Sequence, residues 1–332
     1  MSNTEQMREQ MREQIREQIF NMLYEAEGYV SGEQISAELG VSRSAVWKHI
    51  KALQDEGYTV EAVRNKGYCL VANGIRPAEL MPYLQTKWLG RQFQALGEVD
   101  STNLYAKNLA NGGAVNGTVV AADMQTLGRG RLGRAWSSPK GTGLWFSLVL
   151  RPQITPDKAP QITLTTAVGV AAALRELGYD AGIKWPNDIY IGSRKLCGML
   201  TEMHATMESV EWVVVGIGIN CLNKELPPEI ADIATSLALA ADKPVVRAEV
   251  LGAVLNKLEY YYELLYTQGF GKIREEWLAN NITLGKRVKI STLNETFFGK
   301  ALDMNEDGSL LVEREDGDKD EFTLVTGDVF FA

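Results

Sequence analysis

The sequence predicts a multidomain α+β protein: a helical N-terminal part, a central part mixing strands with helices, and a short C-terminal part built from strands. Three observations predict this. Apolar residues recur at helical spacing early in the chain, long apolar strands and helical stretches share the middle, and short alternating runs separated by turns make up the end. A length of 332 residues accommodates two or three domains. We expect boundaries at residues 1–73, 77–280 and 283–332.

The N-terminal part opens with one apolar face of a helix, whose members are spaced by four and three: Met7, Met11, Ile15, Ile19 and Met22. Ser31 and Ser42 can cap two shorter helices, and Gly40 breaks the pattern between them. Two short helices joined by a tight turn make a helix-turn-helix. Two alternating segments then flank a turn at residues 64–67, which predicts a hairpin. A helix-turn-helix followed by a hairpin is a winged helix.

Charge within residues 1–73 is unevenly distributed. This segment holds eight Lys and Arg against eleven Asp and Glu, a net charge of −3. Cationic and hydroxyl side chains nevertheless gather on the second short helix and on the hairpin turn, where a recognition helix and a wing contact DNA. The predicted DNA-contacting residues are Ser42, Arg43, Ser44, Trp47, Lys48, His49, Lys51, Arg64 and Lys66. The alternative is a winged helix that contacts protein.

The central part does not alternate regularly between strand and helix. Residues 117–123, 144–150 and 211–220 are predicted strands, whereas residues 161–178 and 250–266 are predicted helices. This favours a mixed sheet packed against helices.

The C-terminal part consists of short strand-like runs at residues 286–292, 297–304, 309–315 and 321–331. Turn-forming residues at 305–308 and 315–318 separate them. We expect a small β-barrel.

Composition excludes several classes of protein. The net charge of −8 argues against general nucleic-acid binding, so any DNA contact must come from a local basic face. Three cysteines without C-x-x-C spacing predict reduced, mostly buried thiols, and two histidines leave little for a metal site. No signal peptide opens the chain and no run reaches the ~18 apolar residues of a membrane span, so we expect a cytoplasmic protein.

The strongest chemical signal is the stretch QTLGRGRLGRAWSSPKGTGLWF at residues 125–146. Glycines let a loop approach a ligand closely, and arginines present forked donors to phosphate or carboxylate. The stretch matches neither G-x-x-x-x-G-K-[ST] nor G-x-G-x-x-G. It predicts a flexible cationic clamp for an anion, with a plain solvated loop as the alternative.

Three further motifs accompany it in order: DSTN at 100–103, KWPNDIYIGSRKLCGMLTE at 184–202 and VVVGIGIN at 213–220. Together with GRGR-x-GR-x-W, they make the chain resemble the bifunctional bacterial biotin–protein ligases that double as biotin repressors. The resemblance runs essentially end to end. It implies a winged helix, a class II synthetase-like ligase domain and a small SH3-like barrel. Leu132 departs from the family, in which this position is often charged or aromatic.

The resemblance implies a two-step reaction. Biotin and ATP, with Mg²⁺ on the phosphates, give biotinyl-5′-adenylate, and a lysine of a biotin carboxyl carrier protein then attacks it. No prosthetic group is implied. By resemblance Arg131 and Lys195 act on the carboxylate and phosphate, and Asp188 orients or deprotonates the lysine; a structural turn is the alternative for Asp188. The residues expected around biotin and the adenylate are Ser101, Thr102, Asn103, Gln125, Gly128, Arg129, Gly130, Arg131, Trp136, Lys195, Gly198, Gly218 and Asn220.

Simpler interpretations exist for two of these groups. DSTN is also a good helix start, and Trp136 could be an ordinary core tryptophan rather than a platform for adenine. The family further implies that the adenylate is a corepressor that favours a homodimer on operator DNA. Three rival functions stay open at this stage: a lipoate–protein ligase, a ligand-sensing regulator without catalysis, and a ligase whose winged helix has lost DNA binding.

Overall fold

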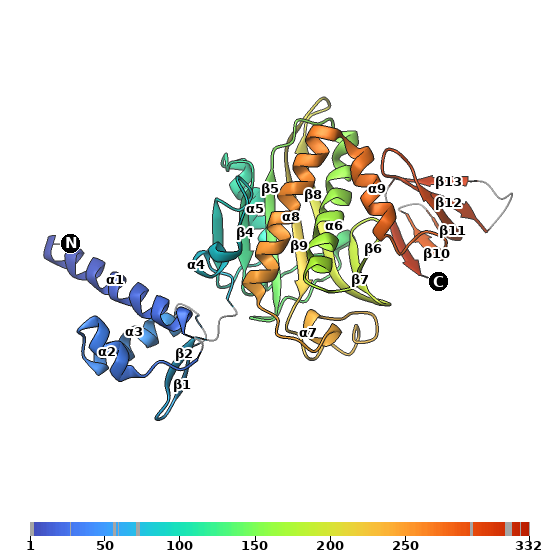
Figure 1. Cartoon of the computed structure of the whole chain (residues 1–332). Helices are drawn as coiled ribbons and strands as arrows, with labels where there is room; N and C mark the ends of the chain where they lie inside the picture. The colour runs from blue at the N-terminus through green and yellow to red at the C-terminus, as the bar shows by residue number, and fades with distance from the viewer. Residues whose placement is uncertain are drawn as a thin grey trace. The chain divides into compact units, whose positions relative to one another are not determined.

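The computed structural model describes residues 3–26, 28–55, 58, 60–70, 74–292, 295–315, 321–325 and 327–331 (Figure 1). The chain forms two compact units, Met1–Gly74 and Ile75–Ala332. Each unit has a hydrophobic core of its own.

The first unit is a winged helix-turn-helix, as predicted. Its elements are α1 (Asn3–Glu25), α2 (Gly32–Leu39), α3 (Arg43–Asp55), β1 (Val60–Val63) and β2 (Gly67–Leu70). Ser31 Oγ accepts a hydrogen bond from the backbone of Gln34 at 3.0 Å, and Ser42 Oγ accepts one from Ala45 at 3.2 Å. Both predicted caps are therefore confirmed. Gly40 ends α2 with a φ of +64°, which glycine adopts at low cost.

The predicted apolar face of α1 is packed over only part of its length. Ile19 and Leu23 are buried, but Met11 is 65% exposed, and the side chain of Met7 lies outside the described ones. The reason is length. At about 1.5 Å per residue, the 23 residues of α1 extend far beyond the 13 of α3, against which it packs.

The hairpin turn is anchored to the segment before α2. Tyr68 N donates to Val30 O at 2.9 Å, and Val30 N donates back to Tyr68 O at 2.8 Å. Gly67 has a φ of +111°, and a Cβ there would lie 2.1 Å from Val30 O. Only glycine fits at residue 67, because any side chain would clash with the backbone of Val30. The glycine therefore allows the hairpin to pack against the segment before α2.

The second unit is built on a mixed sheet, as predicted, and the sheet has seven strands. The strand order is β3-β4-β5-β9-β8-β7-β6. β3 and β4 run parallel, and the other neighbours are antiparallel. The strands are β3 (Phe93–Leu96), β4 (Thr118–Ala122), β5 (Gly143–Leu150), β6 (Ala181–Lys184), β7 (Asp188–Ile191), β8 (Arg194–Ala205) and β9 (Val210–Asn220).

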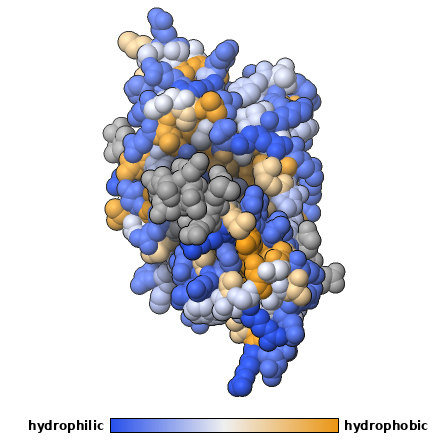
Figure 2. All heavy atoms as spheres, turned by 90° about the vertical axis from the view of Figure 1, so that its left-hand side faces the viewer, coloured by the Kyte–Doolittle hydropathy of each residue, from blue (hydrophilic) through white to orange (hydrophobic). Residues whose placement is uncertain are grey.

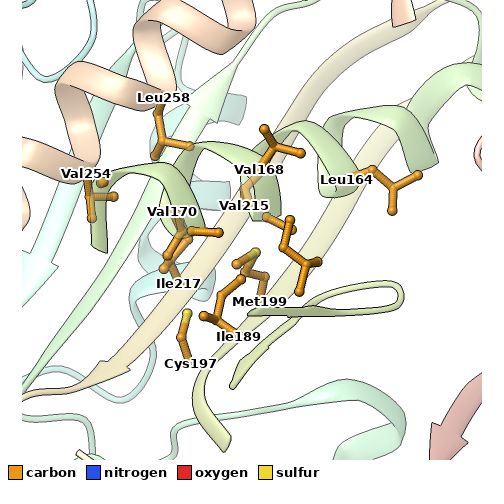
Figure 3. Packing of buried hydrophobic residues seen from close by; sticks show 14 of the residues in the cluster. Leu164, Val168, Val170, Ile189, Cys197, Met199, Val215, Ile217, Val254 and Leu258 are labelled. Carbon is orange, nitrogen blue, oxygen red and sulfur yellow. The ribbon is translucent and has the colours of Figure 1, made fainter. Parts of the chain in front are cut away.

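Long helices cover one face of this sheet. They are α6 (Ala159–Glu176), α8 (Arg247–Gln268) and α9 (Phe270–Asn280), and the short helices of the unit are α4 (Pro77–Leu80) and α7 (Leu237–Ala240). Figure 3 shows Val168 of α6 and Leu258 of α8 in the same apolar layer as Val215 and Ile217 of the sheet. The opposite face is covered by α5 (Thr102–Asn111), which packs on Val120, Val149 and Val214.

Side chains alternate along β9, because successive residues of a strand point to opposite faces. Val213, Val215, Ile217 and Ile219 enter the core under α6 and α8. The intervening residues face α5 first and then, from position 216 onward, the cavity described below.

The C-terminal strands form an antiparallel sheet of order β13-β12-β11-β10-β14. They are β10 (Arg287–Ser291), β11 (Thr296–Met304), β12 (Leu310–Arg314), β13 (Glu321–Leu324) and β14 (Asp328–Phe331). Their buried residues share one core with the central sheet. Trp185, which precedes a cis proline, donates through Nε1 to Gly308 O at 3.0 Å. The turn predicted at 305–308 is confirmed, whereas the one at 315–318 lies mostly outside the described residues.

All three cysteines are unpaired, and Cys197 and Cys221 are buried. Burial raises the pKa of Cys221 to about 12, so its thiol stays protonated at neutral pH. The face drawn in Figure 2 is mostly hydrophilic, with hydrophobic residues scattered among polar ones. Within the described residues, no helix combines the length and the apolar character needed to cross a membrane.

Candidate functional site

A cavity of about 480 Å³ opens beside the carboxyl end of β9. The Arg/Gly loop (residues 125–142), the start of α5, the segment 223–234 and Asp328 of β14 complete its walls. All the predicted ligand-binding residues except Gly128 line it, and so does Asp188. Motifs separated by up to about a hundred residues therefore meet at one place in the structure.

Glycines form the cavity floor because larger side chains need the space above it. A Cβ at Gly216 would lie 2.0 Å from Asn103 Oδ1. One at Gly218 would lie 2.4 Å from Trp136 Nε1, and one at Gly198 would lie 3.0 Å from the same indole. The absence of side chains on the floor is what lets Asn103 and Trp136 reach it.

The polar wall at the start of α5 is hydrogen-bonded within the protein. Gln125 Oε1 accepts from the backbone and hydroxyl of Thr102 at 2.9 and 3.0 Å. Asn103 Oδ1 accepts from Ser147 Oγ at 2.7 Å, and its amide donates to Glu202 at 2.9 Å. This network fixes three predicted ligand-binding side chains in place.

Ser101 occupies the N-cap position of α5, as the alternative interpretation expected, but its side chain makes no capping hydrogen bond. The residue is 5% exposed and lines the cavity. Ser101 therefore lines the cavity without a capping role.

The Arg/Gly loop has a defined local structure. Gly130 N donates to Arg134 O at 2.7 Å, and Trp136 N donates to Gly128 O at 2.9 Å. Gly128 lies behind this turn rather than in the cavity, and a Cβ on it would lie 2.4 Å from Trp136 O. Leu132 at the tip is 67% exposed and has a φ of +53°, a strained value for leucine.

The three arginines of the loop have different surroundings. Arg131 Nη1 donates to Asn187 Oδ1 at 3.4 Å and lies 3.9 Å from Asp328 Oδ1. Arg134 forms a hydrogen-bonded ion pair with the other oxygen of Asp328. Arg129 is exposed on the cavity rim. The loop is therefore held by β14 rather than freely solvated.

Lys195 reaches the cavity because β8 contains a bulge. Tyr190 of β7 pairs with Lys195, whereas the preceding Ile189 pairs with Cys197, so Leu196 is the extra residue. Leu196 and Cys197 are both buried in the core, and Lys195 lines the cavity. Bulges commonly re-aim side chains in this way.

The carboxylate of Asp188 lies beside this lysine. Its Oδ1 is 2.7 Å from Lys195 Nζ. The geometry is that of an ion pair, and among the described residues no group donates a well-aligned hydrogen bond to Oδ1. Asp188 also opens β7 and pairs in register with Gly198, so it has a place in the sheet as well as in the cavity wall.

Trp136 is half-buried, and its ring centroid is 5.3 Å from Lys195 Nζ. Its Nε1 is buried and has no hydrogen-bond partner among the described residues. This feature alone does not set Trp136 apart, because Nε1 of the fully buried Trp277 also has no partner among the described residues. The partial exposure of Trp136 and its place in the cavity lining argue against the simple core interpretation.

Sequence reasoning missed several lining residues, including Arg134, Asn187, Asp328 and the segment 223–234. The end of that segment is held next to the site by two backbone hydrogen bonds to Lys195. Lys195 N donates to Ile233 O at 2.8 Å, and Thr235 N donates to Lys195 O at 2.9 Å. Asn220 Nδ2 adds a hydrogen bond to Thr235 O at 3.0 Å. The pair Pro227-Pro228, just after the floor strand, was the available signal.

Most of the predicted DNA-contacting residues share one exposed surface of the first unit. On α3, at 100° per residue, Arg43, Ser44, Trp47, Lys48 and Lys51 span about 140° and are all exposed. Ser42 precedes them, and Arg64 and Lys66 are exposed in the wing turn. Arg43 is paired with Glu33 at 2.6 Å.

His49 is separate from this set. It lies about 100° around α3 from Lys48 and is half-buried toward α1. Burial, and then the charges of Arg16 and Arg12, lower the pKa of its imidazole. At neutral pH the ring is uncharged.

Comparisons with known proteins agree with this arrangement. The family model "Biotin/lipoate A/B protein ligase family" matches residues 96–220, "HTH domain" matches 15–69, and "Biotin protein ligase C terminal domain" matches 283–331. The solved biotin protein ligase from Aquifex aeolicus in complex with biotin and ATP is 32% identical, with a TM-score of 0.62. That match covers 73% of this chain and 99% of the other.

Two bifunctional proteins match nearly the whole length. The bifunctional ligase/repressor BirA of Escherichia coli is 31% identical over 86% of this chain and 88% of its own. The bifunctional ligase/repressor BirA of Bacillus subtilis is 44% identical over 88% of this chain and 91% of its own. With a winged helix, a ligase-type cavity and a C-terminal β-domain in the same order, the chain belongs to the biotin–protein ligase family, in its bifunctional ligase/repressor branch.

Proposed function

We propose that the second unit activates biotin with ATP to biotinyl-5′-adenylate and passes the biotin to a lysine of a carrier protein. The observation that carries this proposal is one cavity with a cationic end and a neutral polar end. Its volume of about 480 Å³ suits a ligand of the adenylate's size. The cationic end suits a phosphate joined to a carboxylate.

The first step brings two anions together, which requires positive charge at the place where they react. Arg131 and Lys195 line the cavity and are the catalytic cations of this proposal, with Arg129 at the rim. Trp136 offers a half-buried ring to the adenine, since aromatic rings stack on bases. Mg²⁺ would arrive with ATP and screen its phosphates.

Biotin would occupy the neutral end. Ser101 lines this end, while Thr102, Asn103 and Gln125 form a wall that hydrogen bonds keep rigid. A rigid wall recognises a bicyclic ureido group at a low entropic cost. Gly198, Gly218 and Asn220 form the floor beneath it.

The second step needs an uncharged amine. Asp188 lies on the cavity wall next to Lys195, and its buried Oδ1 accepts no well-aligned hydrogen bond from the described residues, so a rearrangement of Lys195 would open it to the incoming lysine. The amine attacks the carbonyl carbon of the adenylate, AMP leaves, and the proton passes to the carboxylate.

The first unit would act on operator DNA through the exposed face of α3 and the wing turn. Because this unit has a net negative charge, a single copy should bind weakly, and a homodimer on paired half-sites would compensate. The adenylate would be the corepressor: it would reorganise the Arg/Gly loop and so alter the surface that forms the dimer.

The rival functions make different predictions. A lipoate ligase would use lipoate in place of biotin, and a ligand-sensing regulator would bind ligand without turnover. Incubation with biotin or lipoate, Mg-ATP and a biotin carboxyl carrier domain, followed by mass spectrometry of the carrier, separates them. We expect one added biotin and no lipoate.

Replacing Lys195 with alanine should slow formation of the adenylate about 100-fold or more, because one preorganised positive donor is lost. Pyrophosphate release measures this step. Lys158→Ala, which removes an exposed charge outside the cavity, is the matched control and should behave like the wild type. Equal rates in the two variants would contradict the role of Lys195.

Replacing Asp188 with asparagine should leave adenylate formation within a few-fold of wild type and slow the transfer step about 100-fold or more, because a general base is lost and the size is kept. Single-turnover transfer from preformed adenylate to the carrier domain isolates this step. A loss confined to adenylate formation would show that Asp188 acts elsewhere.

Replacing Lys48 and Lys51 together with alanine should weaken binding to double-stranded DNA and lower the slope of log K against log salt by about 1.8, roughly 0.9 per phosphate contact. Fluorescence anisotropy over a salt series gives the slope. His49→Ala should leave the slope unchanged at pH 7.5, since the lowered pKa of His49 keeps the ring neutral. An unaltered slope in the double variant would favour protein contact.

Biotin and Mg-ATP together should strengthen self-association of the full chain by about 5- to 150-fold, the range typical of coupling between two sites. Analytical ultracentrifugation measures it, with biotin alone and ATP alone as controls. If the sedimentation coefficient is the same with and without both substrates, the corepressor proposal fails while the ligase proposal stands.

A further inference from the structure

Lys184, the first residue of the KWPND motif, is a buried lysine without a role in the reaction described above. It ends β6 and faces Asp188 directly across the β6–β7 hairpin. It is 6% exposed and is not part of the cavity lining. Its Nζ lies 3.8 Å from Asp188 Oδ2, whereas Lys195 Nζ lies beside the other oxygen, Oδ1. Asp188 is therefore held between two ammonium groups.

Three aromatic rings surround the ammonium of Lys184. The distances from Nζ to the ring centroids are 5.4 Å for Tyr190, 5.7 Å for Phe330 and 5.5 Å for Phe331. Two of these rings belong to β14 of the C-terminal domain. Ring faces attract a cation, and the attraction strengthens when water is excluded.

A charged ammonium at the buried position of Lys184 carries a desolvation cost. Burial is the main cause that lowers the pKa of Lys184. The negative charges of Asp188 and Asp328 oppose this lowering, whereas the positive charges of Lys195 and Arg134 add to it. A methionine of similar length would fill an aromatic pocket without this desolvation cost. A charge kept at such a site is therefore better explained by what it does to its neighbour than by packing.

We propose that Lys184 is a positioning residue that acts through Asp188: it holds the carboxylate in place at the cavity wall while the carrier lysine is deprotonated. Lys184 neither touches the substrate nor takes the proton. The inference rests on the proposed role of Asp188 as proton acceptor. It also gives the C-terminal strand a part in the transfer step, because Phe330 and Phe331 hold the ammonium in place.

The test compares Lys184→Met with Lys286→Met in the full chain. Lys286 is exposed and its Nζ lies 4.4 Å from the centroid of Phe331, so the control removes a cation from the same aromatic group but not from Asp188. We expect the Lys184 variant to transfer biotin from preformed adenylate about 10- to 100-fold more slowly, a part of what a general base contributes. Adenylate formation should change less than threefold.

Two further readouts separate positioning from a structural role. Lys184→Arg, which keeps the charge, should restore most of the rate. In the Asp188→Asn background, Lys184→Met should have almost no further effect, since two residues that act as one unit are not additive.

Lys184→Gln provides a second neutral variant in case the methionine variant unfolds early, and it should show the same loss. Transfer by a folded neutral variant at the wild-type rate would overturn the inference, as would additive losses with Asp188→Asn. If the wild-type chain forms adenylate and the Asp188→Asn variant transfers biotin at the wild-type rate, the proposed role of Asp188 is overturned instead. The two failures are thus distinguishable.

Discussion

Repulsion among cations is the constraint on which the site depends. Two unit charges 4 Å apart repel by about 4 kcal/mol at an effective dielectric constant of 20, so several cations can share one cavity only if carboxylates separate them. Asp188 lies between Lys184 and Lys195, and Asp328 lies between Arg131 and Arg134. Each carboxylate holds two cations.

The C-terminal domain takes part in both arrangements. Asp328 opens β14, and Phe330 and Phe331 of the same strand face Lys184. The shared hydrophobic core and the hydrogen bond from Trp185 to Gly308 fix this domain against the KWPND segment. The small domain is thus part of the cavity wall rather than an appendage.

Much of the fold and of the cavity could be predicted from the sequence, because the relevant signals are local. Ser31 and Ser42 cap their helices through neighbours three residues away. The floor follows from strand alternation: valines and isoleucines of β9 enter the core, and glycines are left to face the ligand side. Such patterns need no knowledge of distant parts of the chain.

The parts that could not be predicted depend on contacts between distant residues. Arg134 meets Asp328 across 194 positions, and Arg131 meets Asn187 across 56. The bulge that aims Lys195 depends on how β7 pairs with β8, which spacing alone does not reveal. His49 fits a basic helix by composition, but its angular position on α3 places it toward α1.

The ion pair between Arg134 and Asp328 bears on how the loop could serve as a switch. The Arg134 side chain is 54% exposed, but that of Asp328 is only 8% exposed. Taking the loop arginines away from Asp328 would leave a buried carboxylate without a partner, which costs more than breaking an ion pair at the surface. A substrate phosphate or carboxylate is therefore expected to bind the loop arginines in addition to Asp328, beginning with the exposed Arg134. The strained φ of Leu132 at the tip favours a rearrangement of the loop, since the present loop conformation is not at its own minimum. A loop that is held through a buried carboxylate can report the presence of an anionic ligand if that ligand contributes the several kcal/mol needed to shift it between two arrangements.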